Sequence, residues 1–131
     1  MRRYTAAIGL IVIVAGCGLN VQSADLFVLT RTGPGNALTL LVTDSGTIRC
    51  DGGPAHTLPD PLLLQARQLA GDLDQDVKVK LRIAPVAGSV YSYAVKLQDG
   101  TLSFPDKAAA THSELARAEL FTAQAAQTAC G

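Results

Sequence analysis

Residues 90–104, VYSYAVKLQDGTLSF, decide the fold of this chain. Up to residue 97, large apolar and aromatic side chains stand at every second position, namely Tyr91, Tyr93, Val95 and Leu97. Such alternation is typical of a β-strand with one buried face and one solvated face. Asp99-Gly100 is a strong hairpin signal, because this dipeptide tolerates the positive φ angles of a tight turn. The stretch therefore predicts an antiparallel hairpin that returns through residues 101–104.

Other apolar runs extend the predicted sheet. Residues 26–31, 37–43 and 47–50 are short and are separated by turns that contain Gly, Pro or Asp. Short strands joined in this way form antiparallel meanders. Residues 77–83, VKVKLRI, alternate apolar positions with Lys78, Lys80 and Arg82, and they predict a further strand with a basic outer face.

Two segments have the periodicity of amphipathic helices. The first follows Asp60, a candidate N-cap, and Pro61 at the first helical position, and we expect it to end between residues 71 and 74. The second starts where Thr111 and Glu114 have the spacing of a capping box, and it continues to about Thr128. The expected buried positions are Leu62, Ala66, Leu69 and Leu73 in the first helix and Leu115, Ala118, Phe121 and Ala125 in the second.

These elements predict an α+β fold. We expect one domain over residues 25–131, with an antiparallel sheet of about six short strands and both helices packed on one face. The expected order is two strand triplets, each followed by a helix.

The first sixteen residues are typical of an export signal. Arg2 and Arg3 give a basic start, residues 6–14 are apolar and uncharged, and small residues follow. The apolar run is about half as long as the roughly 20 residues that a membrane-spanning helix needs.

Residues 14–17, VAGC, resemble the lipobox of bacterial lipoproteins. The resemblance implies that Cys17 receives a diacylglycerol and that the chain is cleaved between Gly16 and Cys17. Residues 17–24 would then be a short lipidated tether, and the protein would lie outside the cytoplasm, anchored to the cell membrane. The alternatives are ordinary secretory cleavage and an uncleaved apolar tail.

The chain has three cysteines. If Cys17 carries lipid, Cys50 and Cys130 remain, and a pair of cysteines in an exported chain predicts a disulfide. This disulfide would link the second helix to the end of the third strand. The alternative is two buried free thiols.

Charge argues against a nucleic-acid partner. The chain has 11 basic and 11 acidic residues, so loss of Arg2 and Arg3 with the signal leaves a small acidic excess. The expected partners are the membrane, through the lipid, and an envelope protein or polymer. Lys78, Lys80 and Arg82 could contact anionic lipid or wall polymer, but a role in strand solubility is favoured.

Catalytic signals are weak. His56 lies in a Gly- and Pro-rich loop and His112 lies inside the predicted capping box, and the sequence has no G-x-S-x-G motif. Both histidines are therefore interpreted as solvated surface residues. We expect a protein that is not an enzyme, and a small envelope hydrolase that uses His56 is the alternative.

Metal-binding signals are weak too, and we expect no cofactor. Cys50, Asp51 and His56 lack the paired short spacing of a zinc site. Asp72, Asp74 and Asp76 begin like a calcium loop, but Val77 and Ile83 stand where such a loop needs Gly and Glu.

Three segments beyond the lipobox resemble small actinobacterial lipoproteins of uncharacterised function. They are DLFVLTRTG, TLLVTDSGTIRC and ARAELFTAQAA, within residues 25–130. The resemblance implies a lipid-anchored exported domain and brings no activity.

A second resemblance is to the subtilisin-inhibitor-like proteins of the same bacteria. It covers the apolar strands that lead to Cys50, the loop 52–56 and the helix from Pro61. Those inhibitors use two disulfides, whereas this chain offers one at most. The leading hypothesis is therefore a non-catalytic binding module of the envelope, and a protease inhibitor is the runner-up.

Overall fold

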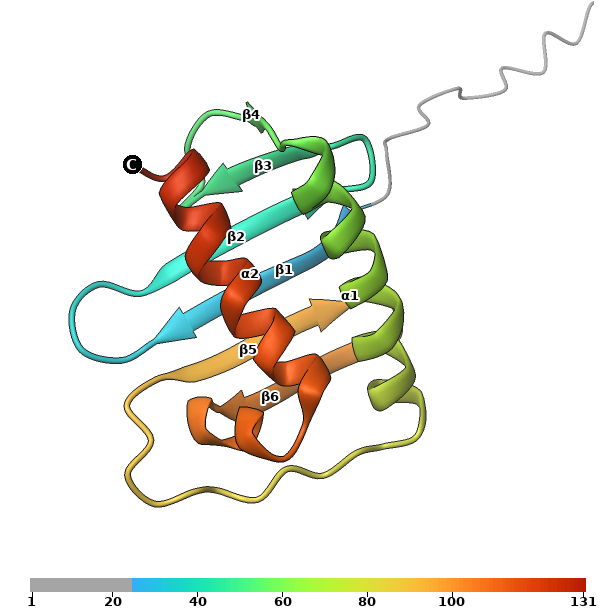
Figure 1. The fold of residues 1–131 in the computed structure, drawn as a ribbon, viewed down its shortest axis with the longest axis vertical. Helices are drawn as coiled ribbons and strands as arrows, with labels where there is room; N and C mark the ends of the chain where they lie inside the picture. Colours follow the sequence, from blue (N-terminus) through green and yellow to red (C-terminus); the bar gives the residue numbers. More distant parts are fainter. Residues whose placement is uncertain (1–24) are drawn as a thin grey trace, which may run out of the picture.

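The computed structural model describes residues 25–131. The predicted signal peptide, the lipidation at Cys17 and the tether up to residue 24 lie outside the described residues. Six strands form one antiparallel sheet in the order β4-β3-β2-β1-β5-β6 (Figure 1). The strands are β1 Asp25–Thr32, β2 Leu38–Thr43, β3 Thr47–Cys50, β4 His56–Thr57, β5 Ser92–Leu97 and β6 Gly100–Pro105.

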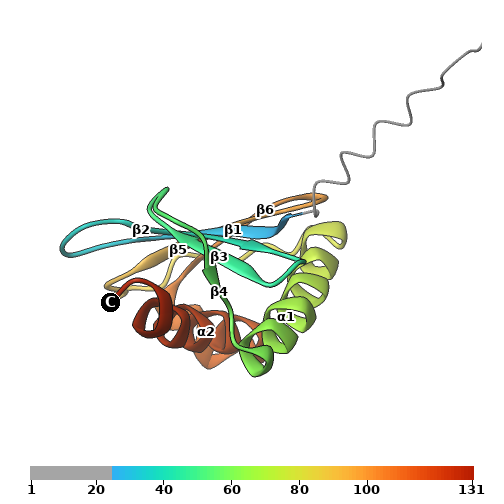
Figure 2. The same ribbon diagram turned by 90° about the horizontal axis from the view of Figure 1, so that it is seen from above.

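Both long helices cover the same face of this sheet (Figure 2). They are α1 Asp60–Lys78 and α2 Ser113–Ala129, and a short 3₁₀ helix, η1 Asp106–Ala110, precedes α2. The predicted α+β class, with two helices on one face of an antiparallel sheet, is confirmed.

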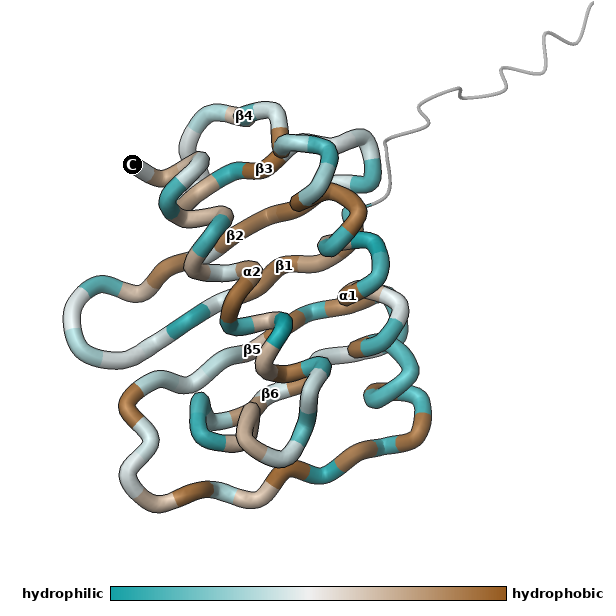
Figure 3. The backbone as a smooth tube through the Cα atoms, in the orientation of Figure 1, coloured by the Kyte–Doolittle hydropathy of each residue, from teal (hydrophilic) through white to brown (hydrophobic). Residues whose placement is uncertain are grey.

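The core lies between the sheet and the two helices. Phe27 of β1 meets Phe121 of α2 edge to face, with ring centroids 5.7 Å apart. Figure 3 shows hydrophobic stretches along β1 and β2, the central strands of the sheet. All eight helix positions predicted from the periodicity are buried, namely Leu62, Ala66, Leu69, Leu73, Leu115, Ala118, Phe121 and Ala125.

The strand predicted over residues 77–83 is wrong. Helix α1 continues to Lys78, and residues 81–86 belong to no strand. The reason is that Val77 follows Leu73 by four residues and therefore continues the helical apolar stripe. Val79 is the C-cap, and Lys80 follows it with a φ of 56°. The Lys80 N–H donates to the Val77 carbonyl and the Leu81 N–H to the Asp76 carbonyl, which is the Schellman pattern.

Three smaller expectations are also corrected. The sheet is completed by β4, within the segment expected to be an irregular loop, so four strands precede α1 and two precede α2. Asp60 is the first residue of α1, and Pro59 occupies the cap. At α2 the cap is His112, without a side-chain hydrogen bond, while the Thr111 hydroxyl donates to the Ala108 carbonyl (3.3 Å). The predicted capping box therefore does not form.

The disulfide joins Cys50 to Cys130, with 5.7 Å between the two Cα atoms. It connects the last residue of β3 with the residue that follows α2. This is the cysteine pair predicted from the sequence. Within residues 25–131, no helix has the length and hydropathy needed to cross a membrane.

Candidate binding surface

The two ends of the sheet differ in what they carry. At one end, β1 begins with Asp25, where the N-terminal segment joins the domain. At the opposite end lie the β1–β2 loop, residues 33–37, and the second half of the long connection between α1 and β5 (Figure 1). We call residues 84–91 the distal loop. This end of the domain therefore carries both the β1–β2 loop and the distal loop.

Asp106 fixes the distal loop to the start of η1. Its Oδ2 accepts the backbone N–H groups of Val90 and Tyr91, both at 3.1 Å. The Asp106 N–H in turn donates to the Tyr91 carbonyl at 2.9 Å. These bonds favour the charged carboxylate, so the pKa of Asp106 lies below its usual value, chiefly because of the Tyr91 N–H.

Tyr91 is held from the side of β1 as well. The Arg31 guanidinium carbon lies 5.0 Å from the centroid of the Tyr91 ring, in a cation–π contact. Gly33 lies against the same ring, and a Cβ atom on it would stand 2.5 Å from Tyr91 Cδ1 and 2.8 Å from the Val90 carbonyl oxygen. The β1–β2 loop and the distal loop therefore fit against each other only because residue 33 lacks a side chain.

The distal loop presents apolar side chains to solvent, and its end at Val90 and Tyr91 is fixed by Asp106. Val86 is 40% exposed and Val90 is 56% exposed. A loop that is already ordered loses less conformational entropy on binding than a free one. Exposed apolar side chains on an ordered loop are a suitable surface for a protein partner.

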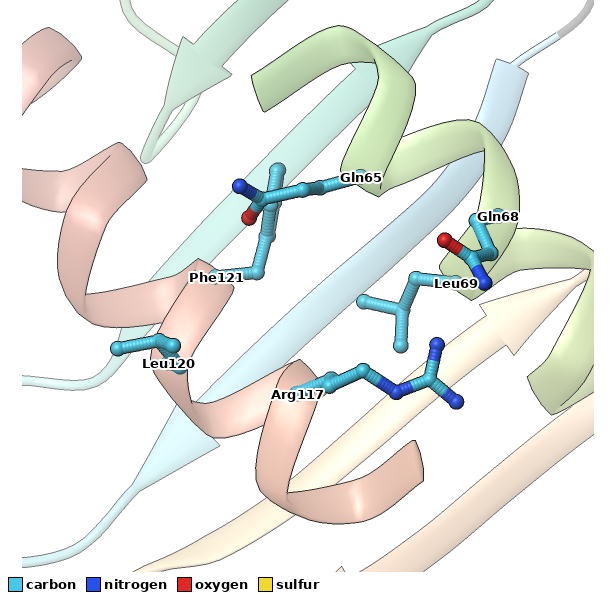
Figure 4. A pocket seen from close by; sticks show the side chains of 6 residues that line it. All are labelled: Gln65, Gln68, Leu69, Arg117, Leu120 and Phe121. Atoms are coloured by element: carbon cyan, nitrogen blue, oxygen red, sulfur yellow. The ribbon is translucent and has the colours of Figure 1, made fainter. Parts of the chain in front are cut away.

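A small hollow lies between the two helices (Figure 4). Its volume is about 150 Å³, and Leu69 of α1 and Phe121 of α2 form its apolar floor. Arg117 lines it and forms an ion pair with Asp72 at 2.8 Å. The other lining residues are Gln65, Gln68 and Leu120. The single charge in the lining is thus already neutralised within the protein.

The histidines are not brought into a catalytic arrangement. His56 is exposed in β4, and it is paired with Ile48 of β3 through the backbone. His112 caps α2, with its Nδ1 3.7 Å from Glu114 Oε1. Among the described residues, neither side chain hydrogen-bonds to a serine or cysteine that could act as a nucleophile.

The acidic residues considered for calcium point to different partners. Asp72 pairs with Arg117, and the Asp74 Oδ1 accepts the Asp99 N–H at 3.2 Å. All three aspartates lie on α1, whose geometry turns side chains two residues apart to different sides. Cys50 is in the disulfide, and the described part of the chain contains no group of three or more His, Cys, Asp or Glu side chains that could hold a metal ion.

Asp76 has an unusual environment at the end of α1. Its Oδ2 is buried and has no hydrogen-bond partner. Burial, and after it the neighbouring Glu114 carboxyl, raise the pKa of Asp76 to about 6. Glu119 on α2 is raised to a pKa of about 7, mainly by burial and then by the charge of Asp106. Each of these carboxyl groups costs stability when it is ionised.

The basic face predicted for residues 78, 80 and 82 does not exist as a strand face. Lys78 lies on α1 and pairs with Asp74 and Asp99, both at 3.4 Å. Lys80 lies at the helix end, and Arg82 is exposed in the segment that follows. Tyr93 is buried and stacked on Phe104 with centroids 5.1 Å apart, whereas Tyr91 supports the distal loop.

The sequence gives little sign of the contacts that order the distal loop. Asp106 follows Pro105, which indicates the end of a strand. Nothing in the local sequence indicates that Asp106 binds Tyr91, fifteen residues earlier. From the sequence, Gly33 indicates only a turn. The chain matches no known family model, and no curated protein or solved structure is significantly similar to it.

Proposed function

We propose that this protein is an exported, lipid-anchored binding module of the cell envelope, held at one end of its sheet and presenting the other. The observation that carries the proposal is that the N-terminal attachment and the distal loop lie at opposite ends of the domain. The chain joins β1 at Asp25, and the ordered distal loop with its exposed Val86 and Val90 lies at the opposite end (Figure 1).

The proposed anchor limits where the partner can be. With Cys17 lipidated, the eight residues 17–24 would span at most about 30 Å, because an extended chain covers no more than about 3.6 Å per residue. The domain would therefore remain close to the membrane surface, with the distal loop directed away from its attachment point. Such a geometry favours a partner in the envelope.

Anchoring is tested by Cys17→Ser in the full chain. We expect the wild type in the membrane fraction with the mass of a lipid-modified chain, and the variant in the soluble fraction. Ser23→Ala, in the proposed tether, is the matched control and should stay with the membrane. A Cys17→Ser variant that remains membrane-bound contradicts the anchor.

Binding by the distal end is tested by photo-crosslinking in envelopes. A photoreactive residue at position 86 should give a discrete adduct, whereas one at position 45, exposed in the turn that precedes β3 at the proximal end, should not. Equal adducts from both positions would contradict the assignment of the distal loop.

Protease inhibition is a second candidate, and the Asp106 contacts favour it. An inhibitory loop must be rigid, and the second disulfide that would stiffen it is missing here. The two backbone N–H groups accepted by Asp106 and the contact of Gly33 with Tyr91 supply such stiffness to the distal loop. The exposed Val86 would then be the side chain offered to a protease.

Titration of serine proteases with the purified chain tests this candidate. Inhibition should weaken in Asp106→Ala, which frees the loop, and should persist in Asp51→Ala, whose carboxylate accepts the Thr39 N–H away from this loop. Absence of inhibition across proteases with different specificities removes this candidate and leaves the binding module.

A further inference from the structure

The outer edge of β6 pairs with no other strand of the described chain. The opposite edge of the sheet is β4, which has only two residues, whereas β6 has six. The sequence of β6, GTLSFP, contains no charged side chain. Proteins usually shorten such edges or place charges on them, because unpaired backbone groups attract other strands. A long, uncharged edge is therefore a candidate interaction surface.

The register shows which backbone groups face outward. The Asp106 N–H donates to the Tyr91 carbonyl, so the pair 91–106 belongs to the hydrogen-bonded series between the two strands. Because hydrogen-bonded pairs alternate along an antiparallel ladder, Leu102 and Phe104 also bond to β5. The N–H and carbonyl groups of Thr101 and Ser103 consequently point away from the sheet.

The neighbouring chain segment flanks this edge but forms no hydrogen bond with these groups, and Thr101 and Ser103 are exposed. Residues 81–86, LRIAPV, follow α1 and form no strand pairing. A hollow of about 360 Å³ is lined by this segment, by the start of β5 and by the end of β6. Its lining is apolar at Ile83, Pro85, Val86, Phe104 and Pro105, and it also includes Tyr93 and the uncharged Ser89, Ser92 and Ser103.

We propose that β6 binds an extended strand of a partner protein as a seventh strand of the sheet, with one apolar side chain of that strand in the hollow. The proposal rests on the binding-module function and names its class of partner. Outward N–H and carbonyl groups at Thr101 and Ser103 match the backbone of another strand. The apolar lining, with no charged residue, selects an uncharged side chain.

The segment 81–86 is a poor occupant of the same edge. Pro85 has no N–H to donate, and Leu81 already donates its N–H to Asp76 at the end of α1. A partner strand can use both outward residues of β6 without these restrictions. The other edge of the β5–β6 hairpin is not available to a partner, because β5 already pairs with β1.

Amide exchange measured by NMR tests the proposal. The chain carries Cys17→Ser to stay in solution, and the probe is a capped six-residue peptide of alternating valine and threonine. At saturation, exchange of the Thr101 and Ser103 amides should slow by about tenfold or more, as expected for new hydrogen bonds of roughly 1.4 kcal/mol. The Leu102 and Phe104 amides, already bonded to β5, should change little.

Two matched variants identify the edge. Ser103→Pro removes an outward donor and should weaken peptide binding by about tenfold, while Ser103→Ala keeps the donor and should bind like the wild type. If Ser103→Pro does not fold, the same peptide with alternate N-methylated residues replaces it and should give no protection.

Several outcomes would overturn the proposal. They are unchanged exchange at Thr101 and Ser103, equal binding by the two variants, and equal binding of the methylated peptide. Protection that grows with protein concentration in the absence of peptide would show that the occupant is a second copy of this chain. Because the test uses the soluble variant, its result is independent of the membrane fractionation that tests the anchor.

Discussion

Gly33 is the residue on which the fit between the two distal segments depends. An alanine there would place its Cβ 2.5 Å from Tyr91 Cδ1, closer than real contacts allow. We expect Gly33→Ala to displace the Tyr91 ring and to lower the free energy of unfolding by about 1–3 kcal/mol, the usual cost of overpacking. Chemical denaturation followed by tyrosine fluorescence measures the change.

Gly71 provides a control of opposite sign for that experiment. It lies inside α1, and a Cβ added to it meets no atom within 4 Å. Gly71→Ala should therefore stabilise the protein by up to about 1 kcal/mol through helix propensity. If both alanine variants have the same effect, Gly33 does not act through the contact with Tyr91.

Asp76 should make stability depend on pH. Its pKa is raised to about 6 in the folded protein from an ordinary value of 3.8, so between these values the folded state binds more protons than the unfolded state. The contribution of Asp76 to the free energy of unfolding should therefore fall as pH rises from about 4 to about 6 and then level off. Denaturation at a series of pH values measures this slope.

Asp76→Asn should reduce the slope and should be more stable than the wild type at pH 8. Part of the slope should remain, because Glu119 has a pKa raised to about 7 from 4.5 and acts in the same direction. Glu119→Gln should remove the part that extends to higher pH. A wild type whose stability rises between pH 4 and pH 7 would contradict both assignments.

At the scale of the element, the end of α1 shows where sequence reasoning failed. The pattern VKVKLRI satisfies the twofold period of a strand, but Val77 also satisfies the helical period that starts at Leu62. Val77 follows the helical period, and Lys78 pairs with both Asp74 and Asp99 from the last turn of the helix. The Asp99 contact joins α1 to the β5–β6 turn, and no local pattern shows it.

Lys80 ends α1 at a cost that can be measured. Its φ of 56° lies in the left-handed region, which costs a residue with a Cβ roughly 1 kcal/mol relative to glycine. Lys80→Gly should raise the free energy of unfolding by about that amount, because Lys80 forms no ion pair within residues 25–131 and its side chain is exposed. Denaturant unfolding at constant pH tests the gain.

Lys78→Gly is the contrasting variant. Lys78 has helical backbone angles and pairs with two aspartates, so glycine there should lower stability. Should Lys80→Gly also be destabilising, the Schellman end of α1 would not be under the expected conformational strain.

At the scale of the whole molecule, the sequence predicted the elements whose residues follow a local pattern. The hairpin around Asp99-Gly100, the first three strands and both helical stripes were expected, because periodicity and turn chemistry are local. The disulfide was expected from counting cysteines. The contacts of Asp106 with Val90 and Tyr91, and the free edge of β6, depend on how distant segments meet, and a single sequence does not encode them as a pattern.

The disulfide links the end of β3 to the C-terminal end of α2. It closes a loop of 80 residues between Cys50 and Cys130. In the double variant Cys50→Ala/Cys130→Ala the unfolded chain gains freedom, and we expect a loss of about 2–4 kcal/mol in the free energy of unfolding. The fold should persist, because Leu115, Ala118 and Phe121 hold the first turns of α2 on the sheet.

The loss should be unevenly distributed along α2. Amide exchange should accelerate most near Ala126 and Ala129, beyond the last fully buried position at Ala125, and least near Leu115. Reducing agent should lower the stability of the wild type to that of the double variant and should leave the variant unchanged. If reduction does not alter the wild type, the link contributes nothing to stability, and packing alone holds the final helix on the sheet.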